Sequence, residues 1–225
     1  MKLRVGFLTI GQSPRVDVMD DFSKVLSKNI VVVEKGALDG LSKDEIEEKL
    51  RPEPGHTVYV SRLIDGSEVK MAKEKVIPLM QKKIKEFEGE KVDVIAILCS
   101  GEFPEFESKA PIIYPDKLLK AFVKGIRFKG TLGVLVPLKE QISYAREKWG
   151  KYANSLIARN ASPYTISEEE FQTIVSELAK HNPSIIVLDC VGYSFKHKKI
   201  VREITGKPVI STRGVIARIL NEMAE

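Results

Sequence analysis

The sequence predicts an α/β protein made of two similar parallel-sheet lobes. Short runs rich in Val, Ile and Leu alternate with helical segments along the chain, which is typical of a parallel sheet covered on both faces. The two halves of the chain also resemble each other. With 225 residues the protein has room for two modest cores, since domains commonly span about 100 to 200 residues.

The first half carries its strands and helices in alternation. Apolar runs bounded by turn residues predict strands at residues 3–9, 30–34, 57–63 and 92–98. The segments between and after them have helical patterns, which predict helices at residues 16–27, 43–50, 71–87 and 116–124. Ser42 and Glu45 have the spacing of a capping box, which supports the second of these helices.

The second half shows the same alternation. It predicts strands at residues 131–136, 155–160, 184–189 and 208–211. It predicts helices at residues 139–152, 168–180, 195–205 and 212–223. Ser167 and Glu170 form a second capping-box pattern at the start of one of these helices.

An internal repeat links the two halves. Arg4 to Thr9 resembles Thr131 to Val136, and Val94 to Gly101 resembles Ile185 to Gly192. In both halves a cysteine ends an apolar strand and a glycine follows two residues later. The first half is longer because of an insertion, and its segment 51–69 predicts a loop with a strand or hairpin near the site.

No Ser- or Gly-rich linker separates the halves, so we expect the chain to cross between lobes near residues 112–117 and 206–210. These crossings return the last strand and helix to the first lobe. The first lobe is therefore predicted to comprise residues 1–115 and 208–225, and the second lobe residues 116–207.

Composition narrows the class of protein. The hydrophobic share of 43% and the charged share of 30% are those of an ordinary globular chain, and no apolar stretch is long enough to cross a membrane. The net charge of +5 is spread without a basic block, which argues against nucleic acid and suits a small anionic metabolite. The presence of only two cysteines, with no export signal, favours the reducing cytoplasm. The sequence leaves open whether the protein forms a homodimer.

Cys99 and Cys190 are the candidate catalytic residues. Ligands of open parallel sheets bind beyond the carboxyl ends of the strands, where both cysteines are predicted to lie. A carbon acid held between two facing thiols could lose its proton to one and regain a proton from the other, without a cofactor. The alternative is that each cysteine is a small buried hydrophobic residue.

Candidate substrate-binding residues occupy the loops beside these strand ends. Arg15, Arg62 and Arg213 could each pair with a substrate carboxylate, although each could equally be a solvated side chain. Glu102 and Asp189, close to the cysteines, could act as acid/base, orienting or merely structural groups. The remaining candidates are loop residues that we expect to contact the substrate: Gly11, Gln12, Ser13, Ser100, Gly101, Val191, Gly192, Tyr193 and Thr212.

The sequence gives no support for a cofactor or a metal. The loop from Gly11 to Arg15 lacks the glycine spacing of a dinucleotide or phosphate-binding loop, and the two cysteines do not form a Cys-x-x-Cys pair. His56, His181 and His197 lack metal-ligand spacing, and we expect them at the surface.

Four segments together resemble the AroM family: TIGQSPRVDV from Thr9, RPEPGHTVYVSRLIDG from Arg51, ILCSGEFP from Ile97 and LDCVGYS from Leu188. The family is similar to the aspartate/glutamate/hydantoin racemase superfamily and is associated with aromatic amino-acid metabolism. The resemblance implies two flavodoxin-like lobes, related by pseudo-twofold symmetry, that enclose a cysteine pair in an interlobe cleft. It matches Cys99 and Cys190 to the two cysteines of that superfamily.

The match departs from amino-acid racemases next to the cysteines. Those enzymes usually have Asn-Thr after the first cysteine and Thr with His or Glu after the second. This chain has Ser100-Gly101 and Val191-Gly192 instead, which argues against an amino-acid substrate.

Three functions remain open from the sequence. The first is a cofactor-independent racemase or epimerase-like isomerase acting on a small carboxylate through two opposed cysteines. The second is an isomerase or decarboxylase that uses a single cysteine. The third is a non-catalytic metabolite-binding protein linked to aromatic amino-acid metabolism.

Overall fold

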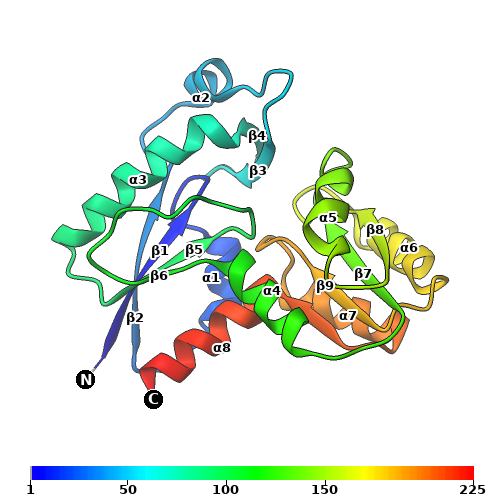
Figure 1. Ribbon diagram of the computed structural model, residues 1–225. Helices are drawn as coiled ribbons and strands as arrows, with labels where there is room; N and C mark the ends of the chain where they lie inside the picture. The colour runs from blue at the N-terminus through cyan, green and yellow to red at the C-terminus, as the bar shows by residue number, and fades with distance from the viewer. Residues whose placement is uncertain (1) are drawn as a thin grey trace. The chain divides into compact units, whose positions relative to one another are not determined.

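The computed structural model describes residues 2–225, which divide into two compact units (Figure 1). The first unit contains the chain up to Pro115 together with Ile216–Glu225, and the second contains Asp116–Val215. Each unit is built on a parallel four-stranded sheet within the described residues, which confirms the α/β class predicted from the sequence. Among these residues no helix has the length and apolar character that crossing a membrane requires.

The sheet of the first unit has the strand order β2-β1-β5-β6. Its strands are β1 (Leu3–Thr9), β2 (Ile30–Gly36), β5 (Val94–Leu98) and β6 (Ile112–Ile113). The inserted segment forms an antiparallel hairpin of β3 (Val58–Arg62) and β4 (Glu68–Ala72). The helices of this unit are α1 (Val16–Phe22), α2 (Lys43–Leu50) and α3 (Lys73–Gly89).

The sheet of the second unit has the strand order β8-β7-β9-β10. Its strands are β7 (Thr131–Val136), β8 (Ser155–Asn160), β9 (Ile185–Leu188) and β10 (Val209–Ser211). Its helices are α4 (Pro115–Gly125), α5 (Gln141–Gly150), α6 (Glu168–Ala179) and α7 (Phe195–Thr205), and α8 (Thr212–Ala224) follows β10.

The two sheets repeat one topology in register, as the sequence repeat predicts. In each parallel sheet the strand that comes first along the chain lies between the second and the third of that sheet, which is the order of flavodoxin-like folds. Gly6 pairs with Ile95 and Gly133 pairs with Ile186, so each cysteine follows the paired isoleucine by four residues. The outer strands repeat too: the amide of each isoleucine bonds the carbonyl of a proline, Pro111 at 2.9 Å and Pro208 at 3.0 Å.

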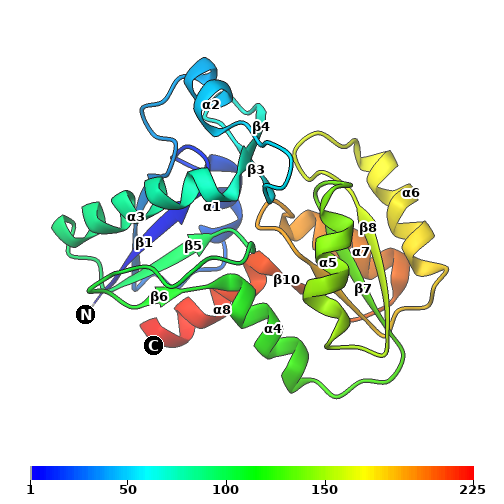
Figure 2. The same cartoon turned by 45° about the horizontal axis from the view of Figure 1, so that its top comes forward.

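Both faces of each sheet are covered by apolar side chains. In the first unit Leu8 packs into the core with α3, while its neighbour Phe7 faces the opposite way and meets Phe22 of α1, with ring centroids 5.1 Å apart. In the second unit α5 and α6 lie on opposite faces of the sheet (Figure 2). Trp149 of α5 packs into the core on one face, and Phe171 of α6 packs into the core on the other. Burial on both faces explains the continuous apolar runs of the central strands.

Most predicted elements agree with the structure to within a few residues. The strands at residues 3–9, 131–136 and 155–160 and the helices at 43–50 and 195–205 have the predicted bounds. Both capping boxes form, with the Ser42 and Ser167 hydroxyls accepting from the N3 amides.

The prediction for the last strand was wrong. Residues 208–211 were expected in the first lobe, but β10 pairs with β9 in the second unit, with Ser211 opposite Leu188. The side chain of Thr212 fixes this register by donating from Oγ1 to the Leu188 carbonyl at 3.0 Å. Only the later part of α8, from Ile216, belongs to the first unit.

Candidate functional site

Each cysteine lies in the loop that leaves the third strand of its parallel sheet, counted along the chain. Cys99 follows β5 and is half-buried, and Cys190 lies two residues beyond β9 and is 8% exposed. Both positions are at the carboxyl end of a parallel sheet, where ligands of this class of fold bind. Both cysteines are free thiols, as the sequence predicts.

The Cys99 loop is held by an aromatic side chain of the inserted hairpin. The amide of Gly101 points at Cys99 Sγ from 3.4 Å, and the hydroxyl of Tyr59 donates to the Glu102 carbonyl at 3.0 Å. A Cβ at position 101 would lie 2.5 Å from Cζ of Tyr59, so the loop and the ring approach this closely only with glycine there. Ser100 beside them is buried.

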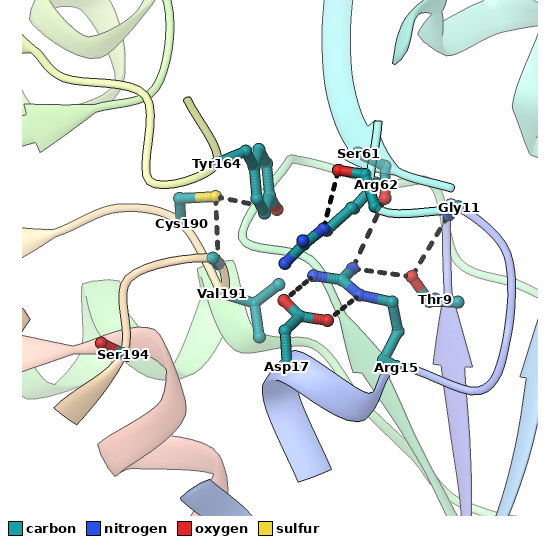
Figure 3. A network of polar contacts seen from close by, with 12 residues as sticks. Thr9, Gly11, Arg15, Asp17, Ser61, Arg62, Tyr164, Cys190, Val191 and Ser194 are labelled. Atoms are coloured by element: carbon teal, nitrogen blue, oxygen red, sulfur yellow. Dashed lines mark hydrogen bonds and ion pairs between the residues drawn. The ribbon is translucent and has the colours of Figure 1, made fainter. Parts of the chain in front are cut away.

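The Cys190 loop has the same construction. The amide of Gly192 points at Cys190 Sγ from 3.3 Å, and a Cβ at position 192 would lie 2.7 Å from Cζ of Tyr164. The hydroxyl of Tyr164 lies 3.8 Å from Cys190 Sγ (Figure 3). The repeat therefore extends beyond the sequence motif: each unit has a cysteine, a backbone N–H at its sulfur and a tyrosine ring against the glycine. The two tyrosines, which the sequence analysis missed, come from non-equivalent segments.

Three predicted substrate-binding side chains instead support the Cys190 loop from within. Tyr193 is fully buried, and its hydroxyl donates to the Ala161 carbonyl at 2.7 Å. Arg213 is 1% exposed and donates from Nε to the Val191 carbonyl at 2.6 Å and from Nη2 to the Gly192 carbonyl at 3.1 Å. The polar atoms of Tyr193, Arg213 and Thr212 bond the protein backbone and their side chains are buried, and their contact with a substrate stays a prediction.

Burial has a further effect on Tyr193. It raises the pKa of the phenol well above its usual value, and the nearby Cys190 and Asp189 raise this pKa in the same direction. The hydroxyl therefore stays protonated and remains a donor to the Ala161 carbonyl.

The loop after β1 places Arg15 in an ion pair. Nε and Nη2 of Arg15 each donate to Asp17 at 2.8 Å, and Nη1 donates to Thr9 Oγ1 at 3.2 Å (Figure 3). Arg15 is 2% exposed. The sequence predicted a carboxylate anchor here, but the bidentate face of this guanidinium already holds a carboxylate of the chain itself.

Gln12 and Ser13 join the loops at this edge of the first sheet. Gln12 donates to the Leu41 carbonyl at 2.9 Å and accepts from the Ile64 amide at 2.9 Å. The amide and hydroxyl of Ser13 both donate to Asp39 at 2.7 Å. Gly11 packs against the hairpin, where a Cβ would lie 2.4 Å from Ser61 Oγ. These contacts fix the conformation of the loop that follows β1.

Arg62 has a different environment from Arg15. It is half-buried, and its Nε donates to the Gly66 carbonyl at 2.9 Å. No described residue accepts a hydrogen bond from its Nη1 or Nη2, so these two groups remain available to a ligand.

A buried ion pair lies directly before Cys190, and the sequence analysis did not identify it. Lys148 Nζ bonds both carboxylate oxygens of Asp189 at 2.9 and 3.0 Å, and the indole N–H of Trp149 donates to Asp189 Oδ2 at 2.7 Å. The side chains of Lys148 and Asp189 are 1% and 5% exposed. This arrangement makes Asp189 an anchored carboxylate instead of the free acid or base that we considered.

Asp116, at the start of α4, is a second buried carboxyl group on which Lys148 acts. Its Oδ2 lies 3.4 Å from Lys120 Nζ, while its Oδ1 is buried and has no hydrogen-bond partner among the described residues. Burial raises the pKa of Asp116, and the charges of Lys120 and Lys148 oppose that shift.

The histidines form no metal site. Within residues 2–225 no group of three His, Cys, Asp or Glu side chains could hold a metal ion. His197 was expected at the surface but is half-buried, because its Nδ1 accepts the Ser194 amide at 3.0 Å in a third capping box at α7. Its ring packs edge-on against Phe171 at 4.8 Å.

Solved structures that resemble this chain include racemases, an isomerase and a decarboxylase. Allantoin racemase from Klebsiella pneumoniae matches with a TM-score of 0.65 at 12% identity, over 99% of this chain and 87% of its own. Maleate isomerase from Pseudomonas putida S16 matches with a TM-score of 0.62 at 15% identity, over 99% and 93%. Aspartate racemase from Picrophilus torridus matches with a TM-score of 0.58 at 15% identity, over 99% and 94%. The chain therefore shares the fold of these enzymes.

A family model narrows this class. The model described as AroM protein matches residues 5–224, which is nearly the whole chain. The protein belongs to the AroM family. A search of curated proteins found no match.

Proposed function

We propose that this protein is a cofactor-independent isomerase of the racemase or epimerase type, and that Cys99 and Cys190 act on opposite sides of one small carboxylate substrate. The observation that carries this proposal is the repeated half-site. Each unit places a free cysteine at a strand end, with a backbone N–H 3.4 or 3.3 Å from its sulfur. A core residue would not need this donor, whereas a thiolate is stabilised by it.

The proposed reaction moves one proton each way. One cysteine, as its thiolate, takes the proton from the carbon beside the substrate carboxylate, and the C–H electron pair becomes the carbanion pair. The other cysteine, as its thiol, then gives its proton to the opposite face of that carbon. The product is the inverted stereoisomer, and the two cysteines have exchanged protonation states, so the next turnover runs in reverse or follows proton exchange with water.

The substrate carboxylate is proposed to bind Arg62. This side chain is half-buried and has both terminal nitrogens available, unlike Arg15 and Arg213. The planar guanidinium suits a carboxylate because two parallel N–H donors match its two oxygens. The net charge of +5 favours an anionic metabolite over a cationic one. A cytoplasmic setting, predicted from the sequence, keeps both thiols reduced.

Hydrogen exchange with solvent tests this function. The full-length protein is incubated in heavy water with a panel of small chiral carboxylic acids, and deuterium at the carbon beside the carboxylate is measured by NMR. We expect incorporation with at least one acid, and a fall of about 10²- to 10⁴-fold in Cys99→Ser and in Cys190→Ser. Lys199→Met, at an exposed ion pair on α7, is the control and should exchange normally. Failure to exchange any acid in the panel would contradict the proposal.

One difference between the half-sites favours a second candidate, an isomerase or decarboxylase with one reactive thiol. The Tyr164 hydroxyl lies 3.8 Å from the sulfur of Cys190, whereas the Tyr59 hydroxyl is bonded to the Glu102 carbonyl. Two-thiol chemistry predicts comparable losses in the two Cys→Ser variants. A variant that keeps most of the activity would instead identify the other cysteine as the single reactive group.

A further inference from the structure

The most unusual feature of the second unit is the buried charge next to Cys190. Lys148 and Asp189 are almost fully buried, and their contacts of 2.9 and 3.0 Å make a complete ion pair. A buried ion pair is weak as a stabilising device, because apolar side chains of similar volume often serve the fold equally well or better. Stabilisation of the fold is therefore a poor explanation for this ion pair, and a role for it at Cys190 is the alternative.

The internal repeat shows that the fold does not require a charge at this position. Asp189 is equivalent to Leu98 of the first unit, which also directly precedes its cysteine and is 1% exposed. The strands that lead to the two positions pair in the same register with their neighbours, Gly6 with Ile95 and Gly133 with Ile186. The charge pair is thus an addition made at one cysteine only.

Strand geometry places the pair and the thiol on opposite sides of the chain. Leu188 and Cys190, two residues apart, pack into one core with side chains of α6 and α7. The side chain of Asp189, between them, points to the other face and bonds Lys148 of α5. Asp189 is also fixed through its backbone, because its amide donates to the Leu135 carbonyl at 2.9 Å. Asp189 directly precedes Cys190 in the chain, and both groups act on the same neighbour, because Cys190 and Asp189 each raise the pKa of Tyr193.

We propose that Lys148 and Asp189 are positioning residues that set how readily Cys190 ionises. Lys148 cancels the negative charge of Asp189, which would otherwise oppose a thiolate beside it. The hydrogen bond from Trp149 to Asp189 holds the residue before the cysteine in place. The inference deepens the proposed function, because it concerns one of the two proposed acid/base groups, and it distinguishes Cys190 from Cys99.

Other ionisable groups of the second unit also face this loop and remain unchanged in the test. Tyr164 lies at the sulfur, and Tyr193 lies within the loop with its hydroxyl on the Ala161 carbonyl. Arg213 of α8 holds the carbonyls of Val191 and Gly192, and His197 of α7 accepts the Ser194 amide. Asp116 and Lys120 of α4 are coupled to the other side of the ion pair, since Lys148 acts on the carboxyl of Asp116.

The test is the pH profile of Cys190 alkylation in the full-length protein. Iodoacetamide reacts with the thiolate, so the rate of loss of the unmodified Cys190 peptide, read by mass spectrometry between about pH 6 and 10, gives the ionisation midpoint. We expect Lys148→Met to raise this midpoint by about one pH unit, because it leaves Asp189 uncompensated. We expect Asp189→Asn to lower it by a similar amount, because the amide still accepts from Trp149 while the charge is lost.

Opposite shifts of the Cys190 midpoint in the Lys148 and Asp189 variants would show that the two side chains act through their charges and not through a general effect on the structure. The double variant, Lys148→Met with Asp189→Asn, is expected to return the midpoint to within about half a unit of the wild type. Lys199→Met and Glu203→Gln make the same charge changes at an exposed ion pair, and we expect them to leave the ionisation midpoint of Cys190 unchanged. If Lys148→Met does not fold, Lys148→Gln makes the same charge change while keeping an N–H donor for Asp189.

Shifts in the same direction, or shifts of less than about half a unit in folded Lys148 and Asp189 variants, would overturn the inference. Because alkylation needs no substrate, this result is independent of the heavy-water exchange. A protein that shows the opposite shifts but exchanges no acid would refute the proposed function and leave the charge coupling established.

Discussion

Replacing Gly101 by alanine tests the packing on which the Cys99 half-site depends. The new Cβ would lie 2.5 Å from Cζ, 2.6 Å from the hydroxyl oxygen and 2.8 Å from Cε2 of Tyr59, where ordinary contacts begin near 3.4 Å. The ring or the loop must therefore move by close to 1 Å. Tyr59 is 3% exposed and bonded to the Glu102 carbonyl, so neither can move freely.

We expect Gly101→Ala to lower the free energy of unfolding by about 2 kcal/mol, as overpacking of a tight core does. For a chain of this size, that corresponds to a fall in melting temperature of about 4 to 8 °C. Gly89→Ala, at the end of α3, is the matched control, because no heavy atom lies within 4 Å of its Cβ position. Urea unfolding of the two variants side by side gives the comparison.

The same contact predicts a rescue. Tyr59→Leu removes the atoms that the new Cβ would meet, so the double variant should be more stable than the sum of the single changes by about 1 kcal/mol. Equal stability of Gly101→Ala and Gly89→Ala, or strict additivity with Tyr59→Leu, would show that the Tyr59 ring does not restrict position 101.

Three further predictions follow from buried or capping groups. Tyr193→Phe should cost about 1 kcal/mol in urea unfolding by removing the bond to the Ala161 carbonyl. In the wild type the raised pKa of Tyr193 contributes stability that is lost as the pH rises above about 10. The Tyr193→Phe variant lacks this group, so its stability should fall less steeply above that pH. Asp116→Asn should raise stability at neutral pH by about 1 kcal/mol, since the raised pKa disfavours the buried carboxylate. That gain should vanish below about pH 4, where the wild-type carboxyl is protonated, and a gain that persists there would contradict this cause. Ser167→Ala should cost about 1 kcal/mol through loss of the α6 cap, and an unchanged unfolding midpoint would show that the cap does not contribute.

The sequence predicted the strands and helices well because their signals are local. Alternation of apolar runs and helical segments located the central strands, and Ser-x-x-Glu patterns located the starts of α2 and α6. The repeat predicted that the two cysteines occupy equivalent places, and the paired registers of Gly6 and Gly133 confirm this.

Other features depended on contacts between distant parts of the chain. The short β6 and the partner choice of β10 are set by pairing with β5 and β9, which no local pattern encodes. Arg15 and Arg213 looked like ligand-binding residues, yet each is occupied by acceptors that only the folded chain supplies.

The Lys148–Asp189 pair was hidden for a similar reason. Lys148 lies on a helix with many charged neighbours and is separated from Asp189 by 41 residues, so only the fold shows that both side chains are buried together. A carboxylate at the place where the repeat has Leu98 was the one signal in the sequence that could have indicated it.

Cys99 and Cys190 are proposed to act on one substrate, and cross-linking tests this without knowledge of that substrate. The folded protein is treated with a short bifunctional thiol reagent, digested and analysed by mass spectrometry. We expect a product that joins the Cys99 and Cys190 peptides within one chain and that is lost when either cysteine is replaced by serine. Singly attached reagent on each cysteine, with no joined peptide, would contradict it.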